Sequence, residues 1–192
     1  VNASSEQGLL AVNGMSYQAR DGENANSALI VTVTPEDFPE EGALGGIAFQ
    51  RDLEKKAWEL GKGKVPVQLF GDFCAHQPSS HLGEIHPNIK GGYVLTDVRS
   101  ILPKELGDSI EEGIFAFGKK LSGFDRKDAV LSGIESRTSS PVRLVRDQKG
   151  LSNITGIYPC GEGAGYAGGI TSAAMDGIKT AEWIASEYMM KL

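Results

Sequence analysis

The feature that most constrains this chain is a glycine-rich segment near its end. Residues 156–170 read GIYPCGEGAGYAGGI, which predicts a short strand at Ile157–Tyr158, then a loop, then a long helix from about Ile170 to Met190. Glycines at this density let the backbone adopt positive φ values and approach a ligand without Cβ clashes. The N–H groups and positive dipole end at the start of the helix suit negative charge on that ligand.

One carboxylate, Glu162, lies inside this loop and narrows the choice of ligand. Like charges repel at contact distance, so a plain phosphate pocket is disfavoured, and the hydroxyl groups of a polyol or sugar fit better. Residues 163–168 also spell G-x-G-x-x-G. That pattern binds a dinucleotide only within a βαβ unit that has an acidic residue about 20 residues further on. Because the sequence ends at Leu192, directly after the helix, we expect another role for the loop.

Bulk properties exclude several classes of protein. The 192 residues, 40% hydrophobic and 23% charged, suit a globular domain with one core, or with one core and an appended element. A net charge of −6 without a basic run argues against nucleic-acid or membrane partners, and no apolar stretch reaches the roughly 18 residues of a membrane span. Residues 1–7 lack the features of a signal peptide. Cys74 and Cys160 match no metal or redox spacing, which favours a reducing cytoplasm, although a disulfide between them is left open.

Hydrophobic periodicity predicts an α+β fold, with a mixed β-sheet and several helices followed by the C-terminal strand, loop and helix. Besides residues 157–158, the expected strands are residues 8–12, 15–19, 28–33, 65–70, 129–134 and 142–145. Besides the last helix, the expected helices are residues 47–60, 97–102 and one from Asp108 or Ser109 to about Leu121. Asn13-Gly14 predicts a β-hairpin, and residues 71–92 predict a long irregular loop.

The last helix has an apolar stripe, which predicts how it packs. We expect its buried face to consist of Ile170, Ala174, Ile178, Ala181, Ala185 and Tyr188. Asp176, Lys179 and Glu182 are expected to face water.

Three ordered blocks of the sequence resemble one known family. The blocks are residues 13–28 (NGMSYQARDG and NANSA), residues 133–143 (GIESRTSSPVR) and the glycine-rich residues 156–170; Phe49–Arg51 and Gly71–Phe73 also fit. Together they resemble the C-terminal part of the predicted FAD-dependent dehydrogenases that are labelled NAD(FAD)-utilizing. The resemblance implies a flavoprotein that passes hydride between an unknown substrate and FAD. Family members carry their Rossmann fingerprint near the N-terminus, so we expect this chain to be a C-terminal fragment.

The resemblance also implies a division of the chain and a set of site residues. Residues 1–145 would form a substrate-side domain inserted into the flavoprotein, and residues 146–192 would complete the FAD-binding domain together with the N-terminal FAD-binding region of the same polypeptide. The implied cofactor-binding residues are Gly161, Glu162, Gly163, Gly165, Gly168, Gly169 and Ile170. Glu162 would accept hydrogen bonds from ribityl hydroxyls. For the glycines, close packing of a helix on a sheet remains the alternative.

A second set of residues is implied to contact substrate or cofactor. It consists of Arg137, Thr138, Ser139, Arg143, Asn24 and Asn26. Either Arg137 or Arg143 would bind a substrate carboxylate or the FAD pyrophosphate. From the residues alone, a turn with exposed arginines is the better explanation of the first stretch, and turn residues that cap their own backbone are the ordinary explanation of Asn24 and Asn26.

Other reactive residues are given ordinary roles. His76, His81 and His86 recur every five residues and share no face of a helix or strand, so we expect exposed loop histidines and no metal site. Cys160 is expected to be a buried, packing thiol. No general base is identified, and we expect the fragment alone to be inactive and to bind FAD weakly or not at all. A polyol- or nucleotide-binding module and a non-catalytic scaffold remain the alternatives.

Overall fold

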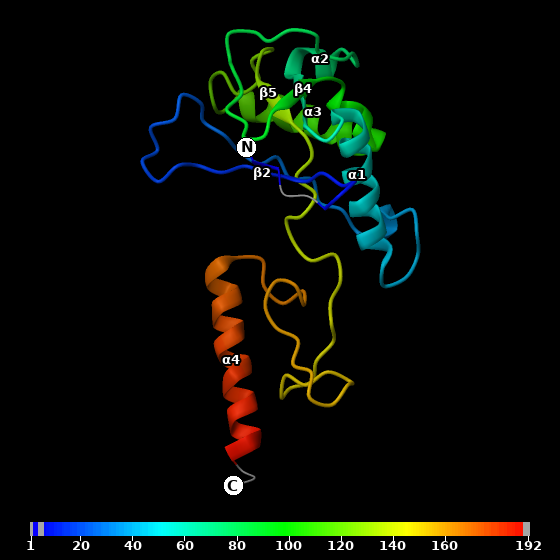
Figure 1. Cartoon of the computed structure of the whole chain (residues 1–192), viewed down its shortest axis with the longest axis vertical. Coiled ribbons are helices and arrows are strands. Elements are labelled where there is room, and N and C mark those ends of the chain that lie inside the picture. Colours follow the sequence, from blue (N-terminus) through cyan, green and yellow to red (C-terminus); the bar gives the residue numbers. More distant parts are fainter. Residues whose placement is uncertain (1, 4–5, 190–192) are drawn as a thin grey trace. The chain divides into compact units, whose positions relative to one another are not determined.

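The computed structural model describes residues 2–3 and 6–189, and these divide into two units (Figure 1). Unit 1 runs to Asp37 and then from Phe49 to Ser136. Unit 2 comprises Phe38–Ala48 and the chain from Arg137 onwards.

The elements make an α+β fold with a mixed sheet, which confirms the predicted class (Figure 1). The strands are β1 (Asn2–Ala3), β2 (Val12–Asn13), β3 (Val65–Leu69), β4 (Tyr93–Leu95) and β5 (Val130–Ser132). The helices are α1 (Gly45–Gly61), α2 (Phe70–Cys74), α3 (Lys104–Gly118) and α4 (Ile170–Met189), with 3₁₀ turns η1 (Pro35–Asp37) and η2 (Val98–Ile101).

The sheet of unit 1 is built around β3. This strand is parallel to β4, with Val65 opposite Tyr93, and antiparallel to β5, with Leu69 opposite Val130. All five residues of β3 are buried, as expected for a strand that is covered on both faces. The connection from β3 to the parallel strand β4 contains α2 and an irregular stretch, residues 75–92.

The large hydrophobic core belongs to unit 1. Its buried apolar side chains come from residues 9–12, α1, β3, α2, η2 and α3: Leu9, Leu10, Ala11, Val12, Phe49, Leu53, Ala57, Val65, Val67, Leu69, Phe70, Phe73, Val98, Ile101 and Ile114. The ring of Phe70 meets the ring of Phe115 edge to face, with centroids 5.1 Å apart. Burial of each large apolar side chain contributes about 1.5–3 kcal/mol, so this set is a main stabilising contribution to unit 1.

Two charged side chains, Glu54 and Arg99, are also buried in unit 1. Glu54 accepts a hydrogen bond from the hydroxyl of Ser136 at 2.7 Å. Arg99 donates to the carbonyl of Phe73 at 3.1 Å, pairs with Glu111 at 2.6 Å and also pairs with Asp108. The buried guanidinium is therefore paired, as a charge inside a protein must be. α3 begins at Lys104, after Pro103 at the N-cap position, so Asp108 lies within the helix and does not cap it as predicted.

The N-terminal strand predictions are largely wrong. Val12 donates to the carbonyl of Ile134 at 2.9 Å, and β2 pairs with β1 rather than with residues after Gly14, so Asn13-Gly14 makes no hairpin. Residues 14–33 contain no helix or strand and form the open blue loop of Figure 1. Exposed Met15 and Ile30 show why: the alternating pattern has no core to pack against.

In the middle of unit 1, the predicted element boundaries lie closer to the observed ones. Residues 47–60, 65–70 and 129–134 correspond to α1, β3 and β5. The irregular loop begins later than predicted, because α2 buries Phe70 and Phe73. The helix predicted at residues 97–102 is the 3₁₀ turn η2, whose N-cap is Asp97.

In unit 2, the predicted strands at residues 142–145 and 157–158 do not form. Leu144 makes one backbone hydrogen bond to Ala164, at 3.2 Å, and Ile157 bonds only within its own turn. The predicted helix at residue 170 is present as α4, and Lys179 and Glu182 are exposed as predicted, but the predicted buried face is not buried. Asp176 points inward, and the residues expected to be buried, including Ile170 and Ile178, are exposed.

Candidate functional site

Unit 2 places the segment Arg137–Arg143 against the glycine-rich loop. Ser140 donates its hydroxyl to the carbonyl of Gly163 at 3.2 Å, and a Cβ on Gly168 would lie 3.9 Å from the hydroxyl of Ser139. A Cβ on Gly165 would lie 2.6 Å from the carbonyl oxygen of Val142. Two blocks that are well separated in the sequence therefore meet in one place, and Gly165 is needed because of this close backbone contact.

The loop is folded by its own hydrogen bonds. The N–H of Gly165 donates to the carbonyl of Glu162 at 2.9 Å, and the N–H of Tyr166 donates to the carbonyl of Gly161 at 3.0 Å. Gly161 and Gly165 have φ values of +71° and +79°, which residues with a side chain rarely adopt. The loop thus keeps a defined shape without a neighbouring strand.

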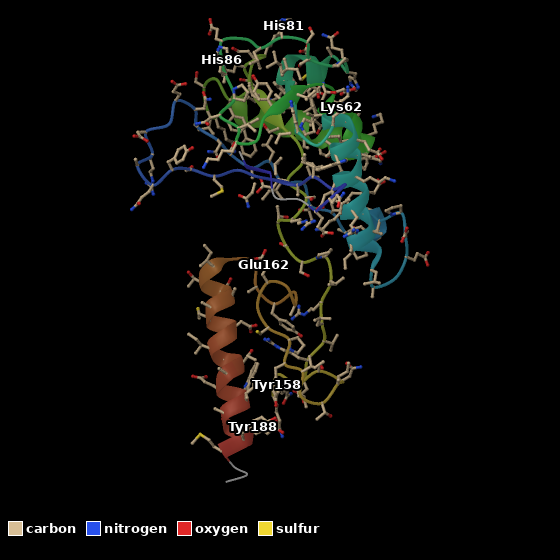
Figure 2. The ribbon with its side chains drawn as sticks, viewed as in Figure 1. Lys62, His81, His86, Tyr158, Glu162 and Tyr188 are labelled. Carbon is tan, nitrogen blue, oxygen red and sulfur yellow. The ribbon has the colours of Figure 1, made fainter. Side chains whose placement is uncertain are left out.

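The side of the loop that carries Glu162 is open. Glu162 is exposed, no hydrogen bond or ion pair of its carboxylate occurs within the described residues, and Figure 2 shows it near the start of α4. A Cβ on Gly163 would meet no atom within 4 Å. Gly168 and Gly169 are also exposed. This surface offers one carboxylate acceptor next to bare backbone.

The N-terminus of α4, which follows the loop directly, supplies hydrogen-bond donors. The first helical hydrogen bond runs from the N–H of Ala173 to the carbonyl of Gly169 at 2.8 Å. The N–H of Gly169 donates to the hydroxyl oxygen of Ser172 at 3.1 Å. The N–H groups of Ile170, Thr171 and Ser172 therefore have no acceptor within the described residues. The loop approaches this first turn, since a Cβ on Gly161 would lie 4.0 Å from the Cβ of Ala173. One carboxylate acceptor and free helix donors therefore belong to the same part of the unit, which suits a ligand with both hydroxyl and anionic groups.

A buried ion pair holds α4 to the loop, and the sequence analysis did not identify it. Arg146 binds Asp176 through two hydrogen bonds of 2.9 and 2.6 Å, with side chains only 10% and 13% exposed. Its guanidinium lies 3.6 Å from the ring centroid of Tyr166 and 5.2 Å from that of Trp183. Asp176 also accepts from the N–H of Gly161 at 2.8 Å. Asp176, predicted to face water, thus fixes the position of the loop.

The electrostatics of this cluster follow from its hydrogen bonds. The Arg146 guanidinium, with help from the Gly161 N–H, lowers the pKa of Asp176 from 3.8 to about 2. The same pairing raises the pKa of Arg146. Further along α4, Tyr158 donates its hydroxyl to Glu187 at 2.6 Å, which raises the pKa of Tyr158 to about 12. All these groups hold the loop and helix together and do not face the open side of the loop.

The comparisons with known proteins bear on this geometry. A family model described as "FAD-dependent protein, C-terminal domain-like" matches residues 1–138. The chain belongs to this family. A Clostridium beijerinckii protein named only as an uncharacterized protein is 52% identical over 191 residues, which is 98% of this chain and 36% of that relative. The chain therefore spans just over a third of the relative's length.

Membership of this FAD-dependent family confirms the resemblance and links the chain to flavoproteins. The matched residues include Asn24, Asn26, Arg137 and Thr138, whereas the glycine-rich loop lies beyond them. The loop does fall within the region aligned with the Clostridium relative, which covers nearly the whole chain.

The residues of the loop fit one part of FAD. Glu162 can accept from hydroxyl groups, bare glycine backbone permits close approach, and the N–H groups at the start of α4 favour negative charge. A βαβ unit with a dinucleotide-binding glycine motif is not seen among the described residues. β3 and the parallel strand β4 are joined by residues 70–92, which contain no G-x-G-x-x-G sequence. This chain of the FAD-dependent family thus offers a partial cradle.

The other predicted site residues are placed differently. Arg143 is exposed beside the loop, with its guanidinium 4.3 Å from the ring centroid of Tyr166. Arg137 and Thr138 are exposed in the same unit. Asn24 and Asn26 lie in unit 1, where their amides donate to the carbonyls of His86 at 2.7 Å and Met15 at 3.2 Å. These two amides form hydrogen bonds that hold the loop at residues 14–33. Their contact with a ligand stays a prediction.

The remaining candidates are exposed surface groups. His76, His81 and His86 are exposed, and within residues 6–189 no cluster of three potential metal ligands was found. Cys160 is exposed, so the expectation of a buried packing thiol is wrong, and both cysteines are free thiols. Burial raises the pKa of the Cys74 thiol. None of the described helices combines the length and apolar character that crossing a membrane requires.

Proposed function

We propose that this chain is the C-terminal portion of an FAD-dependent oxidoreductase, a dehydrogenase in which the loop Gly161–Ile170 contacts the flavin and ribityl part of FAD. The observation that carries the proposal is the open loop, which holds the unpaired Glu162 and leads directly into the unpaired N–H groups at the start of α4, in a chain of the FAD-dependent family. When bound, FAD supplies hydride transfer, and the protein supplies orientation and electrostatics.

Glu162 would hold the ribityl chain in this proposal. Its carboxylate accepts hydrogen bonds from hydroxyl groups, and its position between two glycines leaves room for a ligand on the exposed side. The N–H groups of Ile170 and Thr171 would favour negative charge on the flavin ring by about 0.3–1 kcal/mol where exposed, and up to about 2 kcal/mol where partly buried.

The segment next to the loop would meet the substrate or the cofactor. Ser139 and Arg143 lie beside the glycines, and Arg137 and Thr138 continue the same exposed segment. Arg143 offers a planar cation for a carboxylate or pyrophosphate group. In this division, residues 1–145 form the substrate-side part, including Asn24 and Asn26, and residues 146–192 complete the FAD-binding part.

The rest of the FAD site would come from the N-terminal region of the same polypeptide. The 36% share of the Clostridium relative supports such a region, because most of that relative's length lies outside the alignment. The partial cradle supports it too, since no pyrophosphate-binding glycine motif accompanies β3 and β4. We therefore expect the 192-residue chain alone to bind FAD weakly or not at all.

The test is the flavin content of the complete protein that carries this chain. Glu162→Ala should weaken FAD binding about 10- to 100-fold, because a hydrogen bond to a charged group contributes about 1.5–3 kcal/mol. Glu162→Gln keeps a hydrogen-bond acceptor, so it should lose less affinity for FAD. Glu182→Gln is the matched control, since Glu182 is an exposed glutamate on α4. Unchanged flavin content in Glu162→Ala would reject the proposal and favour a scaffold role.

A further inference from the structure

We propose that Tyr166 is a positioning residue of the FAD site, an inference that rests on the proposed function. Tyr166 fixes Arg143 beside the glycine-rich loop, and the guanidinium of Arg143 binds the phosphate that follows the ribityl chain of FAD. Tyr166, Arg143 and the residues that hold them all belong to unit 2.

The hydroxyl of Tyr166 holds the backbone that follows Arg143. It accepts from the N–H of Arg146 at 3.1 Å and donates to the carbonyl of Leu144 at 3.0 Å. The N–H of Leu144 donates to the carbonyl of Ala164 at 3.2 Å. Because this segment is not part of a strand, these hydrogen bonds are what tie its backbone to the loop.

The backbone of Arg143 itself lies against Gly165. A Cβ on Gly165 would lie 2.6 Å from the carbonyl oxygen of Val142 and 3.1 Å from the Cα of Arg143. The N–H of Gly165 donates to the carbonyl of Glu162 at 2.9 Å. Arg143 therefore packs on the same turn that carries Glu162.

The ring of Tyr166 orients the side chain of Arg143. The guanidinium lies over the ring, 4.3 Å from its centroid, and Arg143 is exposed. A guanidinium over an aromatic face uses its own face for that contact, which leaves the N–H groups along its edge for an anion. A side chain that is already oriented also loses less conformational entropy when it binds a ligand.

Arg146 lies over the same ring, but its N–H groups are already used. Its guanidinium is 3.6 Å from the centroid, binds Asp176 at 2.9 and 2.6 Å and donates to the carbonyl of Pro159 at 2.8 Å. The side chain of Arg146 is only 10% exposed. Of the two arginines at Tyr166, Arg143 is therefore the one that can bind a ligand.

A phosphate is the group of FAD that suits this position. In the proposed function Glu162 holds the ribityl hydroxyls, and the phosphate is the anionic group that comes next along FAD. Arginine binds phosphate oxygens through two parallel N–H donors. A substrate carboxylate has the same kind of oxygen, and the affinity for FAD separates the two, since only a phosphate contact contributes to it.

The experiment measures the affinity of the flavin-free complete protein for FAD by the quenching of flavin fluorescence. Arg143→Gln removes the cation and should weaken FAD binding about 10- to 100-fold. Tyr166→Phe keeps the ring and removes the hydroxyl, so it should weaken binding about 2- to 10-fold. Lys149→Gln removes another exposed cation of unit 2 and should match the parent. Circular dichroism of all three variants checks that they are folded.

A double-mutant cycle tests whether Tyr166 acts through Arg143. In the Arg143→Gln background, Tyr166→Phe should change FAD affinity by less than about twofold, because the residue that Tyr166 positions is already lost. An equal loss in both backgrounds would overturn the positioning role, since Tyr166 would then only shape the loop. An unchanged affinity of Tyr166→Phe in the parent would overturn it as well. Unchanged affinity in Arg143→Gln would overturn the phosphate contact.

Glu162→Ala separates this inference from the proposed function. If Glu162→Ala and Arg143→Gln both weaken FAD binding, the ribityl contact and the phosphate contact are both supported. If only Glu162→Ala weakens it, the phosphate contact alone fails. If only Arg143→Gln weakens it, the ribityl contact of Glu162 fails and the phosphate contact stands.

Discussion

Unit 1 and unit 2 bury different kinds of side chain. Unit 1 encloses large apolar residues such as Phe70, Phe73 and Ile114 around its sheet, whereas unit 2 is organised by Arg146 and Asp176 with two aromatic rings. Apolar burial stabilises in proportion to area, but a buried ion pair recovers little beyond its own desolvation cost. The difference indicates that unit 1 carries its own stability, while unit 2 has a defined shape with little stability to spare.

Two tryptophans allow the units to be followed one at a time. Trp58 belongs to unit 1, where a Cβ on Gly63 would lie 3.2 Å from its ring. Trp183 belongs to unit 2, where a Cβ on Gly150 would lie 2.3 Å from its ring. Because the chain has only these two tryptophans, Trp183→Phe leaves a reporter for unit 1, and Trp58→Phe leaves one for unit 2.

The largest effect is expected from Phe70→Ala. Phe70 is 1% exposed, and removing its ring leaves a cavity under the sheet, which costs about 3–5 kcal/mol of the free energy of unfolding. Urea unfolding followed by Trp58 should show this loss. Leu121→Ala, at a position 55% exposed, is the control and should change the stability by less than about 0.5 kcal/mol.

Trp183, the reporter in unit 2, allows Phe70→Ala to test whether the two units differ in stability as argued above. Trp183 fluorescence should show an unchanged transition in Phe70→Ala if the units unfold separately. A parallel loss at Trp183 would show that unit 2 takes its stability from unit 1, and the contrast between the units would then be wrong.

Sequence reasoning located elements well where the signal is local. The periodicity of residues 47–60 predicted α1, and the glycines before residue 170 predicted where α4 begins. The strands predicted at residues 15–19 and 28–33 failed because alternation requires a core on one side, and those residues extend into solvent. Whether an alternating sequence forms a strand depends on packing partners elsewhere in the chain, which the local sequence does not reveal.

The candidate site shows the same limit. The glycines and Glu162 were identified because their chemistry is written in consecutive residues. Arg146 was missed because its partner Asp176 is 30 residues away, and Asp176 alternates with apolar residues in a way that is typical of a solvent-facing position. The buried face of α4 was predicted wrongly for the same reason. The more apolar stripe, which includes Ile178, was assigned to this chain's own core.

A smaller effect is expected from Asp176→Asn, which removes the charge but keeps the shape. At neutral pH the loss for unit 2 should be about 1.5–3 kcal/mol, because hydrogen bonds to a charged group are replaced by neutral ones and the Arg146 cation loses its counter-ion. Unfolding followed by Trp183 in the Trp58→Phe background measures it. Trp58 in the reciprocal background should report no change.

The lowered pKa of Asp176 sets the direction in which the stability of unit 2 changes with pH. The pKa of Asp176 is lowered from 3.8 to about 2 in the folded chain, so its contribution is present above pH 3.8 and is lost as the pH falls toward 2. The parent should therefore lose part of the stability seen by Trp183 over this interval, and Asp176→Asn should lose less. Identical slopes for the two proteins would show that the ion pair does not support unit 2.

The smallest effect is expected from Lys56→Ala in α1. Lys56 pairs with Asp52 at 2.7 Å, close to the 2.6 Å of Arg146 with Asp176, but both side chains of the α1 pair are 49% exposed. Water screens an exposed pair one helical turn apart, so the loss measured by Trp58 should be about 0.3–0.5 kcal/mol and should shrink further in high salt. A loss as large as that of Asp176→Asn would mean that unit 1 also depends on ion pairs. Two pairs of nearly equal length would then differ in burial but not in energy, and burial could not explain why unit 2 is the less independent part of the chain.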